Sequence, residues 1–229
     1  MNIALILSGG TGTRLGADIP KQYIKVGGKM IISYCIDTFE RCPMIDCIQI
    51  VAEPVWQDTL SSLNISRFRG FSSPGGTRQL SILNGLSDVL RYASDDDKII
   101  IHDGARPLVS QAMIENVILA ADGHDGALPV LPMKDTVYLS EDGRHITSLL
   151  DRSMVVAGQA PECFVLGKYY KANTRLLPDD ILSVNGSTEP AVKAGMDIAV
   201  VRGDENNFKI TTKHDLERFE EIIRNRRNA

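Results

Sequence analysis

The amino-acid sequence predicts an α/β protein built on a mainly parallel sheet. Two observations support this fold class. Short apolar runs take turns with stretches of helical periodicity along most of the chain, which is the pattern of strands joined by right-handed helical crossovers. Polar segments directly follow two of the apolar runs. Since ligands of parallel sheets bind beyond the carboxyl ends of the strands, these segments mark the expected functional edge.

Individual elements follow from the same pattern, in chain order. The apolar runs that predict strands are residues 3–7, 47–51, 98–101 and 126–131. The stretches that predict amphipathic helices, with apolar residues three and four apart, are 30–41, 79–92 and 110–121. The polar segments at the expected edge are residues 8–14 and 102–107.

One stretch departs from this alternation and predicts a projecting β-arm at about residues 133–157. Residues 136–139 and 145–150 favour two strands, and the turn-forming residues 140–144 separate them. A two-stranded ribbon is only marginally stable alone, so we expect it to pack on a second copy of the subunit. The alternative is a hairpin on the edge of its own sheet. The remaining sequence shows no linker, and we expect a single domain over residues 1–229.

Charge and cysteine content narrow the functional classes. The chain has 25 Lys and Arg against 29 Asp and Glu, a formal charge of −4. Neither nucleic acid nor a membrane is expected as a partner, because no broad basic field exists and the longest apolar run, residues 3–7, is far below the roughly 20 residues of a membrane span. Cys35, Cys42, Cys47 and Cys163 form no CxxC pair. Reduced core thiols are favoured over disulfides or metal ligands, which predicts a cytoplasmic protein.

The first polar segment is rich in glycine where a backbone must approach a ligand closely. Its N–H groups can surround phosphate oxygens. The Gly-Lys-Ser/Thr of a Walker loop is missing, and the glycine spacing fits a dinucleotide fingerprint poorly. Arg14 and Lys21 add two cations beside the loop, enough to neutralise a triphosphate locally. The alternative is a tight turn with solvated charges.

Several segments together resemble a known enzyme family. They are residues 7–14 (LSGGTGTR), 19–23 (IPKQY), 75–81 (GGTRQLS), 102–107 (HDGARP), 134–136 (KDT), 151–152 (DR), 158–161 (GQAP) and 207–212 (NFKITT). Over nearly the whole chain, this series is similar to the family of 2-C-methyl-D-erythritol 4-phosphate cytidylyltransferase and ribitol-5-phosphate cytidylyltransferase.

The resemblance implies a three-layer Rossmann-like nucleotidyltransferase fold that joins CTP to a polyol phosphate, releasing pyrophosphate, with Mg²⁺ as cofactor. The residues suit this chemistry independently. A substrate phosphate is already an oxyanion, so the protein needs cations that align and neutralise phosphates and no nucleophile of its own. The sequence contains no Gly-x-Ser-x-Gly elbow, and its four histidines are too widely spread to suggest a zinc site.

The resemblance also implies a role for individual residues. The residues expected to bind the nucleotide are Ser8, Gly9, Gly10, Thr11, Gly12, Gly75, Arg78 and Ser81. The cations expected to act on the reacting phosphates are Arg14, Lys21, Arg152 and Lys209. The residues expected to bind the acceptor are Asp103, Gly104, Arg106, Thr136 and Arg152. Asp103 is also the expected Mg²⁺ ligand, with a helix N-cap as its alternative role, and Asp215 fits an early-helix charge.

In the family, the arm crosses to the partner subunit, so Thr136 and Arg152 would meet the acceptor phosphate in the neighbour's site. This implies a homodimer as the catalytic unit. The alternative is a surface arginine that pairs with Asp151 or Glu162.

Three segments depart from the family pattern. The block at 75–81 is one residue shorter than usual, and residues 158–164 replace the usual Thr-Pro-Gln core. The family's Thr-Asp segment is replaced at 187–190. The acceptor therefore stays open, with 2-C-methyl-D-erythritol 4-phosphate slightly favoured over ribitol 5-phosphate. A nicotinamide-dependent dehydrogenase or a non-catalytic nucleotide-binding module are alternatives from other classes.

Overall fold

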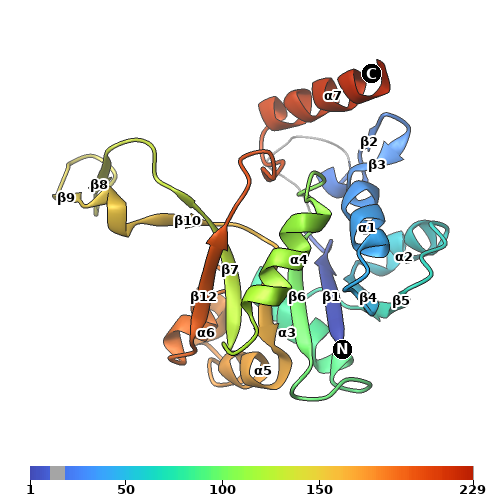
Figure 1. Ribbon diagram of the computed structural model, residues 1–229, viewed down its shortest axis with the longest axis horizontal. Helices are drawn as coiled ribbons and strands as arrows, with labels where there is room; N and C mark the ends of the chain where they lie inside the picture. The colour runs from blue at the N-terminus through green and yellow to red at the C-terminus, as the bar shows by residue number, and fades with distance from the viewer. Residues whose placement is uncertain (11–18, 229) are drawn as a thin grey trace.

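A computed structural model describes residues 1–10 and 19–228 (Figure 1). Its main sheet has eight strands among these residues. They are β1 (Asn2–Leu7), β4 (Cys47–Val51), β5 (Phe68–Ser72), β6 (Lys98–Asp103), β7 (Gly126–Pro132), β10 (Val156–Gly158), β11 (Glu162–Val165) and β12 (Ile198–Arg202).

The strand order explains where the sheet carries its site. It runs β5-β4-β1-β6-β11-β7, and both β10 and β12 pair with β7. Strands β5, β4, β1 and β6 are mutually parallel, whereas β11 is antiparallel to β6 and β7. The carboxyl ends of β1 and β6 are therefore neighbours, with Leu7 in register with Asp103.

Helices cover both faces of this sheet, so the three-layer α/β prediction is confirmed (Figure 1). One face packs against α1 (Ile31–Arg41), α2 (Pro54–Ser61) and α4 (Gln111–Ala120). The other face packs against α3 (Arg78–Val89), α5 (Leu166–Thr174) and α6 (Glu189–Lys193). Along β1, Ala4 and Ile6 enter the first core and Ile3 and Leu5 the second, because strand side chains alternate between faces.

Smaller elements complete the body of the molecule. They are the 3₁₀ turns η2 (Lys21–Tyr23) and η4 (Asp180–Ser183), the short strands β2 (Lys25–Val26) and β3 (Lys29–Met30), and the C-terminal helix α7 (Lys213–Asn228). Helix α7 buries Phe219 and Ile223 against Ile31 of α1. No helix in the described part of the chain is both long enough and apolar enough to cross a membrane.

Helix α3 illustrates how local sequence positions an element against β1. Thr77 caps its N-terminus, because its hydroxyl accepts a hydrogen bond from the Leu80 N–H at 3.2 Å. About two helical turns further along, Gly85 lets the helix approach the sheet, since a Cβ there would lie 2.6 Å from Leu5. The beginning of α3 is thereby fixed beside the carboxyl ends of β1 and β6.

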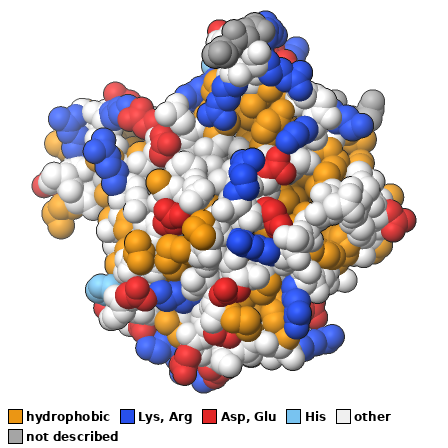
Figure 2. All heavy atoms as spheres, turned by 45° about the vertical axis from the view of Figure 1, so that its right-hand side comes forward, with side chains coloured by type: hydrophobic (Ala, Val, Ile, Leu, Met, Phe, Trp, Pro, Cys, Tyr) orange, Lys and Arg blue, Asp and Glu red, His pale blue; other side chains and the backbone are white. Residues whose placement is uncertain are grey.

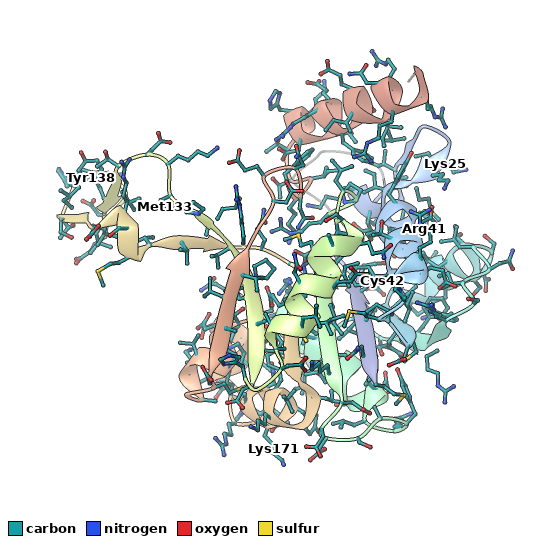
Figure 3. All side chains as sticks on the ribbon, in the orientation of Figure 1. Lys25, Arg41, Cys42, Met133, Tyr138 and Lys171 are labelled. Atoms are coloured by element: carbon teal, nitrogen blue, oxygen red, sulfur yellow. The ribbon has the colours of Figure 1, made fainter. Side chains whose placement is uncertain are left out.

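The β-arm projects from the body, at the left of Figure 1. It contains β8 (Val137–Leu139), β9 (Ser148–Leu150) and the 3₁₀ turn η3 (Arg152–Met154). Figure 3 labels Met133 where the arm leaves the body and Tyr138 near its far end. Tyr138 is 52% exposed, Leu149 67% and Met154 84%. The predicted hairpin is confirmed, with shorter strands, because Asp142 accepts the N–H groups of Arg144 and His145 and extends the turn.

The other predicted elements are confirmed within two or three residues at their ends. The four predicted strands are β1, β4, β6 and β7, and the three predicted helices are α1, α3 and α4. Helix α3 ends at Val89, three residues before the predicted end. All four cysteines are free and buried, as expected. Strands β5, β11 and β12 and helices α2, α5 and α6 were not predicted from the sequence.

Candidate active site

A cleft of about 520 Å³ opens at the carboxyl edge of β1 and β6. Its lining comes from the ends of both strands, the segment before α3, the turn η2 and the chain before α7. The lining residues are Leu7, Gly9, Gly10, Lys21, Gln22, Glu53, Gly75, Gly76, Thr77, Arg78, Ser81, Asp103, Ala105 and Lys209. Most of the nucleotide-binding residues that lie in the described part of the chain, together with Asp103 and Lys209, are therefore brought together here.

The glycine segment after β1 is held from behind by the turn η2. The Gln22 amide donates to the carbonyl oxygens of Ser8 at 2.6 Å and Gly10 at 2.8 Å. The hydroxyl groups of Ser8 and Tyr23 are 2.5 Å apart, and the Tyr23 ring stacks on Trp56 with ring centroids 4.0 Å apart. With its carbonyl groups tied down in this way, the segment presents glycine backbone to the cleft.

A second glycine turn, at Gly75, also lines the cleft and lies beside the first, since a Cβ at Gly9 would be 2.4 Å from Pro74. The Gly75 N–H donates to the Ser81 hydroxyl at 2.9 Å, and that hydroxyl donates to the Thr77 carbonyl at 2.9 Å. A Cβ at Gly75 would lie 2.4 Å from the Leu80 Cβ. Glycine is thus required for the turn to fold over α3, and Ser81 shapes the wall by holding that turn.

Asp103, the last residue of β6, lies at the centre of three cations. Its Oδ1 accepts from Arg78 Nε at 3.1 Å and Nη2 at 3.0 Å. Its Oδ2 is 3.0 Å from Lys209 Nζ and 3.5 Å from Arg106 Nε. On the face of the molecule drawn in Figure 2, Lys and Arg side chains are interspersed with Asp and Glu.

These cations decide the charge state of Asp103. Burial acts to raise the pKa of its carboxyl group, but Arg78, Lys209 and Arg106 outweigh it and hold this pKa well below its usual range. Asp103 is therefore ionised, and its one negative charge leaves the three cations with a net positive charge. Arg106 is fixed further because its Nη1 donates to the Asn207 carbonyl at 2.8 Å.

The predicted role of Asp103 as a Mg²⁺ ligand meets a difficulty in this arrangement. Both oxygens already face cations, and Mg²⁺ binds through open carboxylate oxygens. In residues 1–10 and 19–228, no three His, Cys, Asp or Glu side chains are grouped so as to hold a metal ion. The described residues do not fit a protein-built Mg²⁺ site. Mg²⁺ bound to nucleotide phosphates would enter as part of the substrate.

The other predicted residues differ in where they lie. Thr11, Gly12 and Arg14 lie outside the described residues. Gly104 borders β1 rather than the cleft, since its N–H donates to the Leu7 carbonyl at 2.9 Å. The predicted helix N-cap alternative for Asp103 is wrong, because Ser110 caps α4. Asp215 lies in the first turn of α7, as expected.

Thr136 and Arg152 come together in the arm and not in the cleft. They line a hollow of about 480 Å³ with Leu149, Leu150 and Asp151. The Arg152 Nη1 donates to the Lys134 carbonyl at 2.8 Å. The structure thus joins the two predicted acceptor-binding residues of the arm and separates them from Asp103 and Lys209 of the same chain.

Two side chains that line the cleft, Gln22 and Glu53, and the buried Glu162 were given no site role from the sequence. Gln22 stood in a quoted motif but was given no role. Glu53, the residue before α2, had no local signal. Glu162 is buried and its charge interacts with that of Arg78; its signal was a lone charged residue in an otherwise apolar strand (ECFV).

Comparisons with known proteins cover nearly the whole chain. The sequence profile of a family described as 2-C-methyl-D-erythritol 4-phosphate cytidylyltransferase matches residues 2–225. A protein of that name from Clostridium acetobutylicum is 33% identical over 98% of both chains. A ribitol-5-phosphate cytidylyltransferase from Streptococcus agalactiae serotype III is 30% identical over 100% of this chain and 98% of the relative.

Two further comparisons concern length and fold. The chain matches a bifunctional IspD/IspF enzyme from Paramagnetospirillum magneticum at 34% identity, covering 94% of this chain and about half (55%) of that enzyme. The crystal structure of the Francisella tularensis 2-C-methyl-D-erythritol 4-phosphate cytidylyltransferase superimposes with a TM-score of 0.82 at 27% identity, over 96% of this chain and 98% of that one.

Proposed function

Because the chain belongs to the 2-C-methyl-D-erythritol 4-phosphate cytidylyltransferase family, we propose that it transfers CMP from CTP to a polyol phosphate and releases pyrophosphate. One observation supports this most strongly. Arg78, Arg106 and Lys209 converge on a single carboxylate beside two glycine turns, in a cleft open to a ligand. A nucleoside triphosphate needs this combination of local positive charge and close backbone.

The cleft residues would act by position and charge. Backbone at Gly9, Gly10 and Gly75 would surround the nucleotide, while Lys21 and Lys209 would neutralise its phosphates. The acceptor phosphate, already an oxyanion, would attack the α-phosphorus in line. One new P–O bond forms, the bond to the β-phosphate breaks, and pyrophosphate leaves with the electron pair. Mg²⁺ on the triphosphate supplies further charge neutralisation as part of the substrate. Arg14 would join these cations.

The arm would complete the site across a homodimer. Thr136 and Arg152 form a hollow with a cation at its edge, and exposed apolar side chains such as Leu149 and Met154 cover the arm. A partner surface that covers such exposed apolar side chains would stabilise the complex. We place the acceptor phosphate between Arg152 of one subunit and the cleft of the other. The buried free cysteines favour a cytoplasmic, reducing location. We also expect the enzyme to be a single domain.

Two polyol phosphates are candidates for the acceptor substrate. We favour 2-C-methyl-D-erythritol 4-phosphate, which would place the enzyme in isoprenoid precursor synthesis. Ribitol 5-phosphate is the second candidate, because curated relatives of both kinds match at about the same identity, 33% and 30%. That acceptor would give CDP-ribitol for cell-surface polymers.

Pyrophosphate release with CTP against a panel of polyol phosphates tests the proposal. We expect release with one of the two candidate acceptors and at least tenfold less with the other. CTP binding without release from any acceptor would instead indicate a nucleotide-binding module. Binding of a reduced nicotinamide cofactor in preference to CTP would indicate a dehydrogenase.

A further inference from the structure

Glu162 is a buried carboxylate that interacts with Arg78 of the cleft wall and that the proposed reaction does not use. In the antiparallel pair of β11 and β6, Glu162 is opposite Ile101. Side chains opposite each other in a sheet share a face, and Asp103 is two residues after Ile101 on the same face. Glu162 therefore points toward α3, below Arg78, and only 8% of its surface is exposed.

The groups that face Glu162 come from four elements. Arg78 at the start of α3 and Arg106 after β6 attract its charge, while the ionised Asp103 repels it. The phenol of Tyr169 on α5 is adjacent. The Ser187 hydroxyl, before α6, is close enough to favour the ionised carboxyl group. His102 points to the opposite face of β6, where its ring contacts Phe39.

Two buried polar atoms at this position lack a hydrogen-bond partner among the described residues. Within the described part of the chain, Glu162 Oε2 and Ser187 Oγ are both buried without a hydrogen bond of good geometry. Burying an ionised carboxylate without a full set of hydrogen-bond partners costs a large free energy. Burial accordingly raises the pKa of Glu162 to about 7, although Arg78 and Ser187 act to lower it.

Arg78 connects this carboxylate to the ligand side of the cleft. Its guanidinium contacts Asp103 directly, and its positive charge also interacts with the carboxyl group of Glu162. With Glu162 ionised, two carboxylates oppose the three cations; with Glu162 protonated, only Asp103 does. A bound triphosphate adds several negative charges above Arg78. Those charges disfavour the ionised form of the carboxylate below it.

We propose that Glu162 is a positioning residue that takes up a proton when a nucleoside triphosphate enters the cleft, which leaves Asp103 as the one carboxylate opposing Arg78 and raises the local positive charge by one. Asp103 does not take this part, because three cations keep it ionised. The inference rests on the proposed function in that CTP is the polyanion concerned.

Calorimetric titration of the intact protein with CTP and Mg²⁺ tests the inference, in buffers of equal pH and different ionisation enthalpy. The slope of binding heat against buffer enthalpy gives the protons taken up. We expect wild type to take up about half a proton more than Glu162→Gln at pH 7.5, and about the same number at pH 6, where Glu162 is already protonated. Protons exchanged by CTP itself cancel in this comparison.

Ser187→Ala provides a second variant that keeps the carboxylate. Loss of the hydroxyl that favours ionisation raises the pKa of Glu162 in the free protein, so we expect the pH of maximal proton uptake to move upward. This variant decides the question even where Glu162→Gln does not fold. The KM for CTP should rise with pH above about 7 in wild type and less in Glu162→Gln, a change that a purely structural role would not produce.

The outcomes separate the two proposals. Equal proton uptake by wild type and Glu162→Gln at pH 7.5, with both binding CTP, overturns the role of Glu162 and leaves the cytidylyltransferase proposal intact. An unchanged pH profile in Ser187→Ala has the same meaning. Absence of CTP binding to wild type overturns the proposed function, and the inference with it.

Discussion

The cleft and the arm contain cations in opposite settings. In the cleft, Arg78 and Lys209 converge on Asp103, a residue 7% exposed that sits on a central strand. In the arm, Arg152 contacts a backbone carbonyl, and its neighbour Met154 is 84% exposed. The cleft is thus preorganised by its own chain. In the described structure the arm has no buried core of its own, so under the proposed dimer it is the arm that would gain surroundings from a second subunit.

The two regions also differ in what a lost contact should cost. A buried charge that loses its partner has no water to replace it, whereas an exposed one does. Substitutions in the cleft should therefore affect stability and chemistry together. Substitutions in the arm should affect chemistry or assembly and leave the body of the molecule folded.

The largest effect is expected from Asp103→Asn, which removes the central negative charge and leaves three cations facing one another. The free energy of unfolding should fall by about 3–5 kcal/mol, measured by urea denaturation. Asp122→Asn is the matched control, because Asp122 pairs with Lys98 at an exposed site and should cost less than about 1 kcal/mol. Equal losses in the two variants would contradict the charge cluster.

Lys21→Ala should come next and act on catalysis rather than folding. Loss of a charge-assisted contact to the reacting phosphates should cost about 2–3 kcal/mol of transition-state stabilisation, about 30- to 150-fold in kcat/KM. Lys171→Ala, at the opposite end of the molecule (Figure 3), serves as control. A Lys21→Ala enzyme that turns over CTP within about threefold of wild type would show that the assignment is wrong.

The raised pKa of the Glu162 carboxyl group predicts how the free energy of unfolding varies with pH. Its pKa in the folded state is about 7, above its usual value of 4.5, so the folded protein holds a proton that the unfolded chain has lost. Stability should therefore fall as pH rises through this interval. Between pH 6 and pH 8, the free energy of unfolding of wild type should decrease by about 1 kcal/mol more than that of Glu162→Gln. Parallel curves for the two proteins would contradict this.

Mixed dimers test the arm against the cleft directly. Arg152→Ala and Lys21→Ala should each be nearly inactive, but a heterodimer keeps one site with Lys21 from one chain and Arg152 from the other. Random exchange of equal amounts makes about half the dimers mixed, each with one intact site, so activity should recover to about a quarter of wild type. Activity that stays at the level of the separate variants, although heterodimers form, would mean that Arg152 serves its own subunit.

The sequence predicted the centre of the sheet better than its periphery. Strands β1, β4 and β6 are buried on both faces, so they read as plain apolar runs. Strand β5 (FRGFS) includes Arg69 and Gly70, which weaken any strand pattern. The insertion of β11 between β6 and β7 is a long-range pairing that no local periodicity encodes.

For the site, the sequence selected residues that the structure brings together, but it did not predict how they pair. Arg78, Asp103 and Lys209 were assigned to the nucleotide, the metal or acceptor, and the α-phosphate as separate contacts. In the structure they form one ion-pair cluster, because three segments far apart in sequence end at the same edge of the sheet. Residues that support the cleft residues, such as Gln22 and Glu162, can be recognised only once the packing of these segments is known.

The two ends of the arm join the body of the molecule close to each other. Pro132, at the end of β7, pairs with Val156, at the start of β10, in an antiparallel ladder. The two ends of the arm are therefore one strand spacing apart, about 5 Å. A short turn can bridge that gap without disturbing any register of the main sheet. The arm is in this sense a modular insertion, which a lineage or a designer can lengthen, exchange or delete while the catalytic body keeps its architecture.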